Sequence, residues 1–120
     1  MTFSPAETLL AVHLQELGLH FERQFRYVPG RKFTADFAVW WAKPKRRMKE
    51  PPPLYRLALI EVQGGVYSRQ AHGSVTGILK DNDRLYHAFL NHWPMIRFTP
   101  DEVMNGTAKA MIAAALRGEP

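Results

Sequence analysis

The chain has 120 residues, of which 46% are hydrophobic and 22% charged, and it contains no cysteine. This composition is typical of one ordinary globular domain, and it excludes a disordered or fibrous chain. Without cysteine there are no disulfides and no thiolate metal sites. No apolar run approaches the roughly 18 residues of a membrane helix, and the N-terminus lacks a signal-peptide pattern. We therefore expect an intracellular, cytoplasmic protein with no membrane partner.

The charge of the chain is concentrated in one segment. The formal net charge is +5, from 16 Lys/Arg against 11 Asp/Glu, and a basic domain suggests a polyanionic partner such as nucleic acid. Residues 42–54 carry +4 of this excess, and their prolines exclude a helix or a central strand. The segment is either a DNA-contacting loop or a solvated loop that keeps the protein soluble. Its basic residues are Lys43, Lys45, Arg46, Arg47 and Lys49.

Helical and strand periodicities alternate along the chain. Ser4, Pro5 and Glu7 form an N-terminal helix signature, and Thr99 to Glu102 repeats it. Alternating polar and apolar residues, bounded by Pro-Gly or Gly-Gly, predict strands between these helices. The predicted elements are, in order, a helix over 4–17, strands over 19–28, 32–41 and 55–63, a helix over 73–91, a strand over 94–98, and a last helix from 99 onward.

This order predicts an α/β fold in a single domain over 1–120. The elements run α-β-β-β-α-β with a C-terminal helix, which fits a mixed central sheet flanked by helices. Apolar stripes indicate which helix faces turn inward. For the helix over 73–91 we expect an inward stripe of Val75, Ile78, Leu79, Asn82, Leu85, Tyr86 and Phe89. For the last helix we expect Val103, Thr107, Ala110, Met111 and Ala114.

Two acidic residues interrupt the apolar strands. Asp36 lies in the second predicted strand and Glu61 in the third, which ends at Gly64-Gly65. Burying a carboxylate is unfavourable unless it is paired or binds a metal. Two carboxylates on strands joined by one loop can meet, and their oxygens suit Mg²⁺ or Mn²⁺. The alternative is that each acid pairs with an arginine or lies on a solvated edge.

These residues resemble the PD-(D/E)XK nuclease superfamily, which has a restriction-endonuclease-like core. The resemblance is closest to small phage-type nucleases of the VRR-NUC and Holliday-junction-resolvase kind, and it covers roughly residues 7–112. It rests on the element order and on a series of residues in the family's sequence order. The matching residues are Asp36, then Glu61-Val62-Gln63-Gly64-Gly65, then His72, then Asp81 and Arg84, then Arg97-Phe98-Thr99.

The resemblance implies a phage-type, metal-dependent DNA endonuclease acting on branched or junction DNA. Asp36 and Glu61 would hold Mg²⁺ or Mn²⁺, with the backbone carbonyl of Val62 as a further ligand. In resolvase-like relatives a glutamate of the first helix completes the metal site, and Glu7 matches it. Capping of the first helix explains Glu7 equally well. Cutting two strands of a DNA junction would require two active sites, so a homodimer is an open alternative.

Gln63 departs from the family pattern. The superfamily has a lysine at this position, which positions the attacking water or stabilises the charge of the transition state. Gln63 can orient water but carries no charge. Lys80 is the candidate for supplying the missing cation from elsewhere in the sequence.

Several basic residues near the predicted site are candidate DNA contacts. Arg69 and His72 follow the glycines, so we expect them beside the acids. Lys80, Arg84 and His87 share one face of the second predicted helix, which is either a phosphate-contacting or an ordinary solvated face. The retained acids favour an active nuclease. The lost lysine favours a catalytically inactive DNA-binding module, and a basic domain with a protein partner is the third alternative.

Overall fold

The computed structural model describes residues 3–40, 57–63 and 75–116. Three sequence-predicted features fall outside these ranges: the basic segment 42–54, the Gly64-Gly65 pair, and the candidate contacts Arg69 and His72. The described elements are α1 (Pro5–Glu16), β1 (His20–Arg26), β2 (Thr34–Trp40), β3 (Leu57–Val62), α3 (Val75–Leu90), β4 (Met95–Phe98), α4 (Pro100–Met104) and α5 (Thr107–Leu116).

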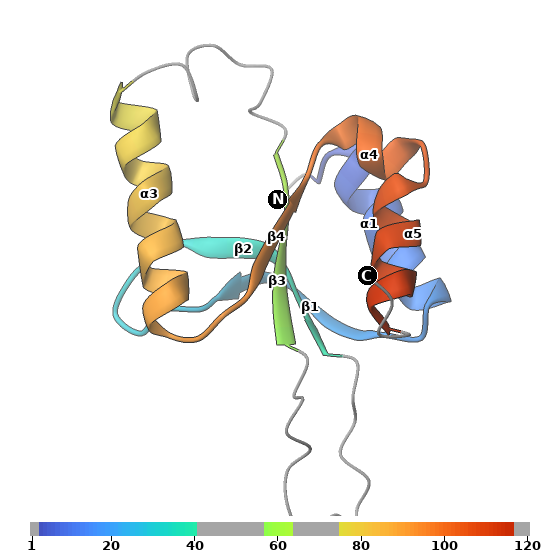
Figure 1. Cartoon of the computed structure of the whole chain (residues 1–120), viewed down its shortest axis with the longest axis horizontal. Helices are drawn as coiled ribbons and strands as arrows, with labels where there is room; N and C mark the ends of the chain where they lie inside the picture. Colours follow the sequence, from blue (N-terminus) through green and yellow to red (C-terminus); the bar gives the residue numbers. More distant parts are fainter. Residues whose placement is uncertain (1–2, 41–56, 64–74, 117–120) are drawn as a thin grey trace, which may run out of the picture.

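The strands form one mixed sheet in the order β1-β2-β3-β4. The first three strands are antiparallel neighbours, and β4 runs parallel to β3. A parallel neighbour requires a crossover connection, and α3 lies within it. Helices cover both faces, with α1, α4 and α5 on one side and α3 on the other (Figure 1). The predicted α/β fold with a mixed sheet flanked by helices is therefore confirmed.

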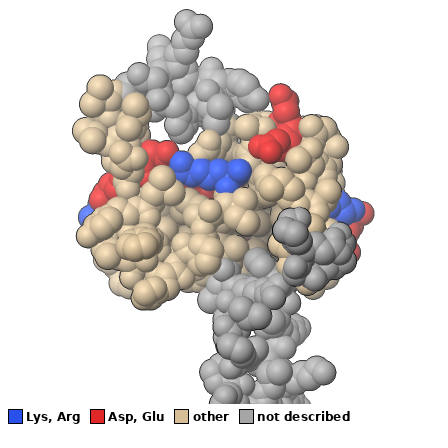
Figure 2. Space-filling view, in the orientation of Figure 1, with Lys and Arg blue, Asp and Glu red and all other residues tan. Residues whose placement is uncertain are grey.

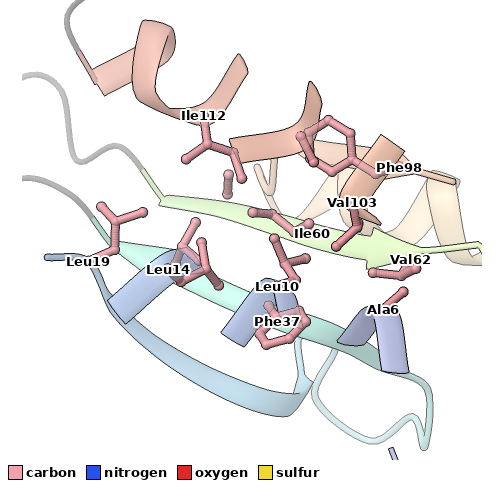
Figure 3. Packing of buried hydrophobic residues seen from close by; sticks show 13 residues of the cluster. Ala6, Leu10, Leu14, Leu19, Phe37, Ile60, Val62, Phe98, Val103 and Ile112 are labelled. Carbon is pink, nitrogen blue, oxygen red and sulfur yellow. The ribbon is translucent and has the colours of Figure 1, made fainter. Parts of the chain in front are cut away.

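The main core lies between the sheet and α1, α4 and α5 (Figure 3). Leu10 and Leu14 of α1 are fully buried against Phe37 of β2 and Ile60 of β3. Alternation along β3 places Ala58, Ile60 and Val62 in this cluster. Full burial of a side chain of this size stabilises the fold by roughly 1.5–3 kcal/mol. This core fixes the two strands that carry the acids.

The C-terminal helical region differs from the prediction. Instead of one helix, α4 and α5 are separated by Gly106, which has a φ of 88°. Only glycine adopts this conformation without a steric penalty, so the chain turns there. The turn also changes which residues face inward. Val103, Ala108 and Ile112 are buried, whereas Thr107, Ala110 and Met111 are exposed, contrary to the predicted stripe.

The orientation of α3 is the largest departure from the sequence prediction. All seven residues of its predicted inward stripe are exposed, and Ala88 is the buried residue of this helix. The opposite side, with Asp81, Arg84 and Ala88, faces the sheet. The prediction was wrong because this face of the sheet carries carboxylates, which need polar partners more than they need an apolar cover.

Candidate active site

Asp36 and Glu61 lie where β2 and β3 separate. The antiparallel register pairs Phe37 with Ile60, and one further step would bring Asp36 opposite Glu61. At that position the contact between the two strands is made by the Asp36 side chain and not by a backbone–backbone hydrogen bond. Its Oδ2 accepts a hydrogen bond from the Val62 backbone N–H at 2.8 Å. The two predicted acids are thus brought together on adjacent strands.

Glu61 is the buried charged residue of the described core, with 6% of its surface exposed. It lies on the face of β3 that looks toward α3, and arginines from two elements approach it. Arg84 of α3 donates a hydrogen bond from Nη2 to Glu61 Oε1. Arg97 of β4 places Nε 3.4 Å from Glu61 Oε2. The parallel register sets Arg97 beside Glu61 on the neighbouring strand.

The two arginines are held by further contacts. Arg97 forms a bidentate pair with Asp81 of α3, with both N–O distances at 2.7 Å. Arg84 Nη2 also donates to the backbone carbonyl of Thr34 at 2.8 Å. Arg84 and Arg97 each have several partners, so both side chains have little freedom to move. The bidentate pair with Asp81 fixes the orientation of the Arg97 guanidinium and strengthens the interaction. Arg84 is therefore a partner of Glu61 in this structure, and the DNA contact expected of it from the sequence stays a prediction.

Gln63 lies directly against Arg97. With its amide oriented so that the oxygen faces the guanidinium, Oε1 accepts from Arg97 Nη1 at 2.9 Å and from Nε at 3.0 Å. The backbone N–H of Gln63 donates to the Phe98 carbonyl. A cation therefore stands beside the position where the resembled family has its lysine. Lys80, the residue predicted for this role, is exposed on α3.

Burial disfavours the ionised form of both carboxylates. Burial raises the pKa of Asp36, and the nearby charge of Glu7 adds to this effect. Burial also raises the pKa of Glu61, although Arg84 and Arg97 oppose it. Shifts of this kind, from burial together with specific charged neighbours, make Asp36 and Glu61 candidates for a functional site.

Glu7 approaches the site from α1. Its backbone N–H donates to the Ser4 hydroxyl, and that hydroxyl donates in turn to Glu7 Oε1 at 3.1 Å. The capping role predicted for this segment is thus present. The influence of Glu7 on the pKa of Asp36 places its charge near the site as well. In the described ranges, no group of three or more His, Asp or Glu residues is close enough to hold one metal ion.

Gln24 is a site residue that the sequence did not reveal. It lies in β1 opposite Asp36 in the strand register, and it has a φ of 50°. This left-handed conformation is uncommon for a residue other than glycine, and such strain often marks a functional position. The Gln24 side chain hydrogen-bonds to Asp36 and accepts from the Thr34 hydroxyl. The sequence carries no signal for it, because a glutamine in a strand is unremarkable.

Tyr27 connects the site to the underside of α3. The ring is buried, and its hydroxyl donates to the Arg84 backbone carbonyl at 3.4 Å. Burial raises the pKa of this hydroxyl, so it stays protonated and able to donate. Tyr27 thus helps to set the position of Arg84 over Glu61.

The donor set fits a hard divalent cation in part. Asp36 and Glu61 supply carboxylate oxygens, the ligands that Mg²⁺ and Mn²⁺ prefer. The Arg84 guanidinium already contacts Glu61, so an ion bound there would share this carboxylate with a fixed cation. The Val62 carbonyl stays a predicted ligand, with its amide tied to Asp36.

Comparison with protein-family models, curated proteins and solved structures finds no match to this chain. No helix in the described part of the chain is long and apolar enough to cross a membrane. The site must therefore be interpreted from its own geometry.

Proposed function

We propose that the chain is a divalent-metal-dependent nuclease with a restriction-endonuclease-like fold, which hydrolyses phosphodiester bonds in DNA. The observation that supports this most is the Asp36–Glu61 pair at the point where two strands separate. Glu61 is buried and Asp36 half-buried, both have raised pKa values, and Glu61 lies beside Arg84 and Arg97.

The proposed roles follow from the contacts. Asp36 and Glu61 would hold Mg²⁺ or Mn²⁺, with Glu7 adding negative charge nearby. A bound divalent ion lowers the pKa of a coordinated water and offsets charge on the phosphate. Gln24 and the Val62 N–H orient Asp36, so the carboxylate is positioned before any ligand arrives. Tyr27 and Thr34 position Arg84 in the same way.

Arg97 is the proposed substitute for the missing lysine. Its guanidinium contacts Gln63 and Glu61 and is anchored by Asp81. Fixed cations beside a phosphoryl group stabilise the charge that develops in the transition state. Gln63 then orients the attacking water through its amide, while Arg97 provides the charge that the amide lacks.

A second candidate function is a nuclease-fold DNA-binding module without catalysis. The observation that favours it is the Arg84–Glu61 ion pair, which engages the carboxylate that a metal would need. In this alternative Arg84 and Arg97 neutralise Glu61 permanently, and the acids serve only to fix α3 to the sheet.

A cleavage assay separates the two candidates. Linear, flapped and four-way-junction DNA are incubated with the protein in Mg²⁺ or in EDTA. We expect Mg²⁺-dependent cleavage, and a fall in rate on the order of 10²-fold or more in Asp36→Asn and in Glu61→Gln. Glu22→Gln, an exposed acid on β1, is the matched control and should cleave normally. DNA binding by the parent without any cleavage would favour the second candidate, and equal rates in all variants would contradict the site.

A further inference from the structure

The outer face of α3 is an apolar surface that the described part of the chain leaves open. Its exposed side chains reach 75% exposure at Phe89 and 73% at Val75. In the space-filling view, uncharged side chains and a group of Asp and Glu atoms both lie on the side of α3 (Figure 2). We call this surface the α3 stripe, and it consists of Val75, Ile78, Leu79, Asn82, Leu85, Tyr86, Phe89 and Leu90.

The α3 stripe has the spacing of a helix-pairing seam. Residues 75, 82 and 89 are seven apart, and residues 78 and 85 follow three positions after the first two. Alternating steps of three and four keep these side chains on one line along the helix, as in two-helix packing. The contacts that hold α3 to the sheet are made by its inner side, at Asp81, Arg84 and Ala88, and they leave the α3 stripe uncovered. The α3 stripe therefore needs a partner surface.

We propose that the α3 stripe is a homodimer interface, in which α3 of one copy packs against α3 of a second copy around a two-fold axis near Asn82. A single polar residue at the core of such a seam fixes register and partner number, because it is buried well only opposite its own equivalent. Asn82 lies at the middle of α3, which spans Val75–Leu90. A two-fold axis at this point brings the two Asn82 amides together, where each can donate to the other.

The size and charge of the α3 stripe agree with a second copy as occupant. Tyr86 and Phe89 are more than half exposed, and five large aliphatic side chains extend the surface. Their combined area is several hundred Å², of the order of the roughly 800 Å² that each partner gives to a stable interface. No position of the α3 stripe is charged, so an identical uncharged stripe complements it. This inference rests on α3 and is independent of the proposed nuclease activity.

The absence of cysteine makes a cross-linking test unambiguous. In Asn82→Cys the new thiol is the sole thiol of each chain, and a disulfide forms readily only when two Cα atoms approach within about 7 Å. We expect rapid formation of a disulfide-linked dimer in Asn82→Cys on mild oxidation. Val12→Cys, at an exposed apolar position of α1, is the matched control and should cross-link much more slowly. Equal cross-linking rates in the two variants would overturn the proposal.

Light scattering after size exclusion gives an independent readout. The parent should be a dimer over a wide range of concentration, whereas Leu79→Glu and Phe89→Glu should be monomers that keep their circular dichroism spectrum. Val12→Glu should stay dimeric. A monomeric parent overturns the proposal. A monomeric parent that also loses thermal stability in Leu79→Glu would show that the chain covers its own stripe.

Discussion

At the scale of single residues, the two site acids are harder to ionise in the folded chain than in water. Burial raises the pKa of both Asp36 and Glu61, so their ionised forms are less favourable in the folded state than in the unfolded chain. Residues arranged against stability are expected where function requires them. This opposition between stability and function can be measured.

The raised pKa of Asp36 makes the stability of the fold depend on pH. Because the folded pKa of Asp36 is raised, the folded state binds more protons than the unfolded state in the window above the ordinary pKa of about 4. The free energy of unfolding therefore falls as pH rises through this window up to the raised pKa. Asp36→Asn keeps an oxygen to accept from the Val62 N–H but cannot ionise. We expect its Tm to be a few °C higher at neutral pH without metal.

Thermal unfolding from pH 4 to pH 8 measures this effect. The stability profile of Asp36→Asn should be flatter than that of the parent, whereas Glu22→Gln should follow the parent. If the proposed site binds Mg²⁺ through this carboxylate in the folded state, adding Mg²⁺ should raise the Tm of the parent and leave Asp36→Asn unchanged. A lower Tm in Asp36→Asn at every pH would show that the charged carboxylate stabilises the strand junction instead.

The second residue-scale prediction concerns the cation beside Gln63. Gln63→Lys restores the residue of the resembled family, but it places a second cation against Arg97. Like charges at this distance repel, so we expect this variant to be less stable and less active than the parent. The double variant Gln63→Lys with Arg97→Gln exchanges the two side chains and should recover activity. Cleavage rates and Tm values of the single and double variants test this coupling, and additive effects would contradict it.

At the scale of elements, the sequence predicted the sheet well and the orientation of α3 poorly. Alternation along β2 and β3 is a local signal, and it placed Asp36 and Glu61 correctly. The direction in which α3 turns depends on the sheet face beneath it. Glu61 requires Arg84, so the polar side of the helix faces inward despite its clear apolar stripe on the other side. That competition is tertiary, and periodicity alone could not reveal it.

The last helical region carries a prediction at the same scale. The Thr99 hydroxyl accepts from the Glu102 N–H, and the Glu102 carboxylate accepts from the Thr99 N–H, which forms a reciprocal capping box. Thr99 directly follows β4, so the cap also fixes how the strand turns into α4. We expect Thr99→Ala to lower the free energy of unfolding by about 0.5–2 kcal/mol in a urea titration. Thr8→Ala, in the exposed middle of α1, is the control and should not destabilise the fold.

At the scale of the whole molecule, charge is divided unevenly between the described and the remaining residues. Eight Lys/Arg and nine Asp/Glu fall on residues 3–40, 57–63 and 75–116, although the whole chain carries +5. Several of those cations are already paired with acids, including Arg84, Arg97 and Arg31. The described part therefore has no excess of positive charge with which to attract a polyanion. Any strong affinity for DNA must come from the remaining segments.

Residues 42–54 supply +4 of the net charge of +5. Residues 42–54 lie outside the described ranges, and they join two strands that each carry a site acid, so their cations are linked in sequence to the proposed catalytic centre.

Each phosphate contact adds about 0.9 to the slope of log affinity against log salt on duplex DNA. Replacing Lys45, Arg46, Arg47 and Lys49 with serine should flatten that slope by roughly 2–3 if most of them touch phosphate. Cleavage at saturating DNA should fall much less than affinity. Binding titrations at several salt concentrations measure the slope, with Lys109→Ser as the control, since this cation of α5 pairs with Glu16 and not with a site acid. An unchanged slope in the fourfold variant would mean that this segment is the solvated loop of the alternative interpretation.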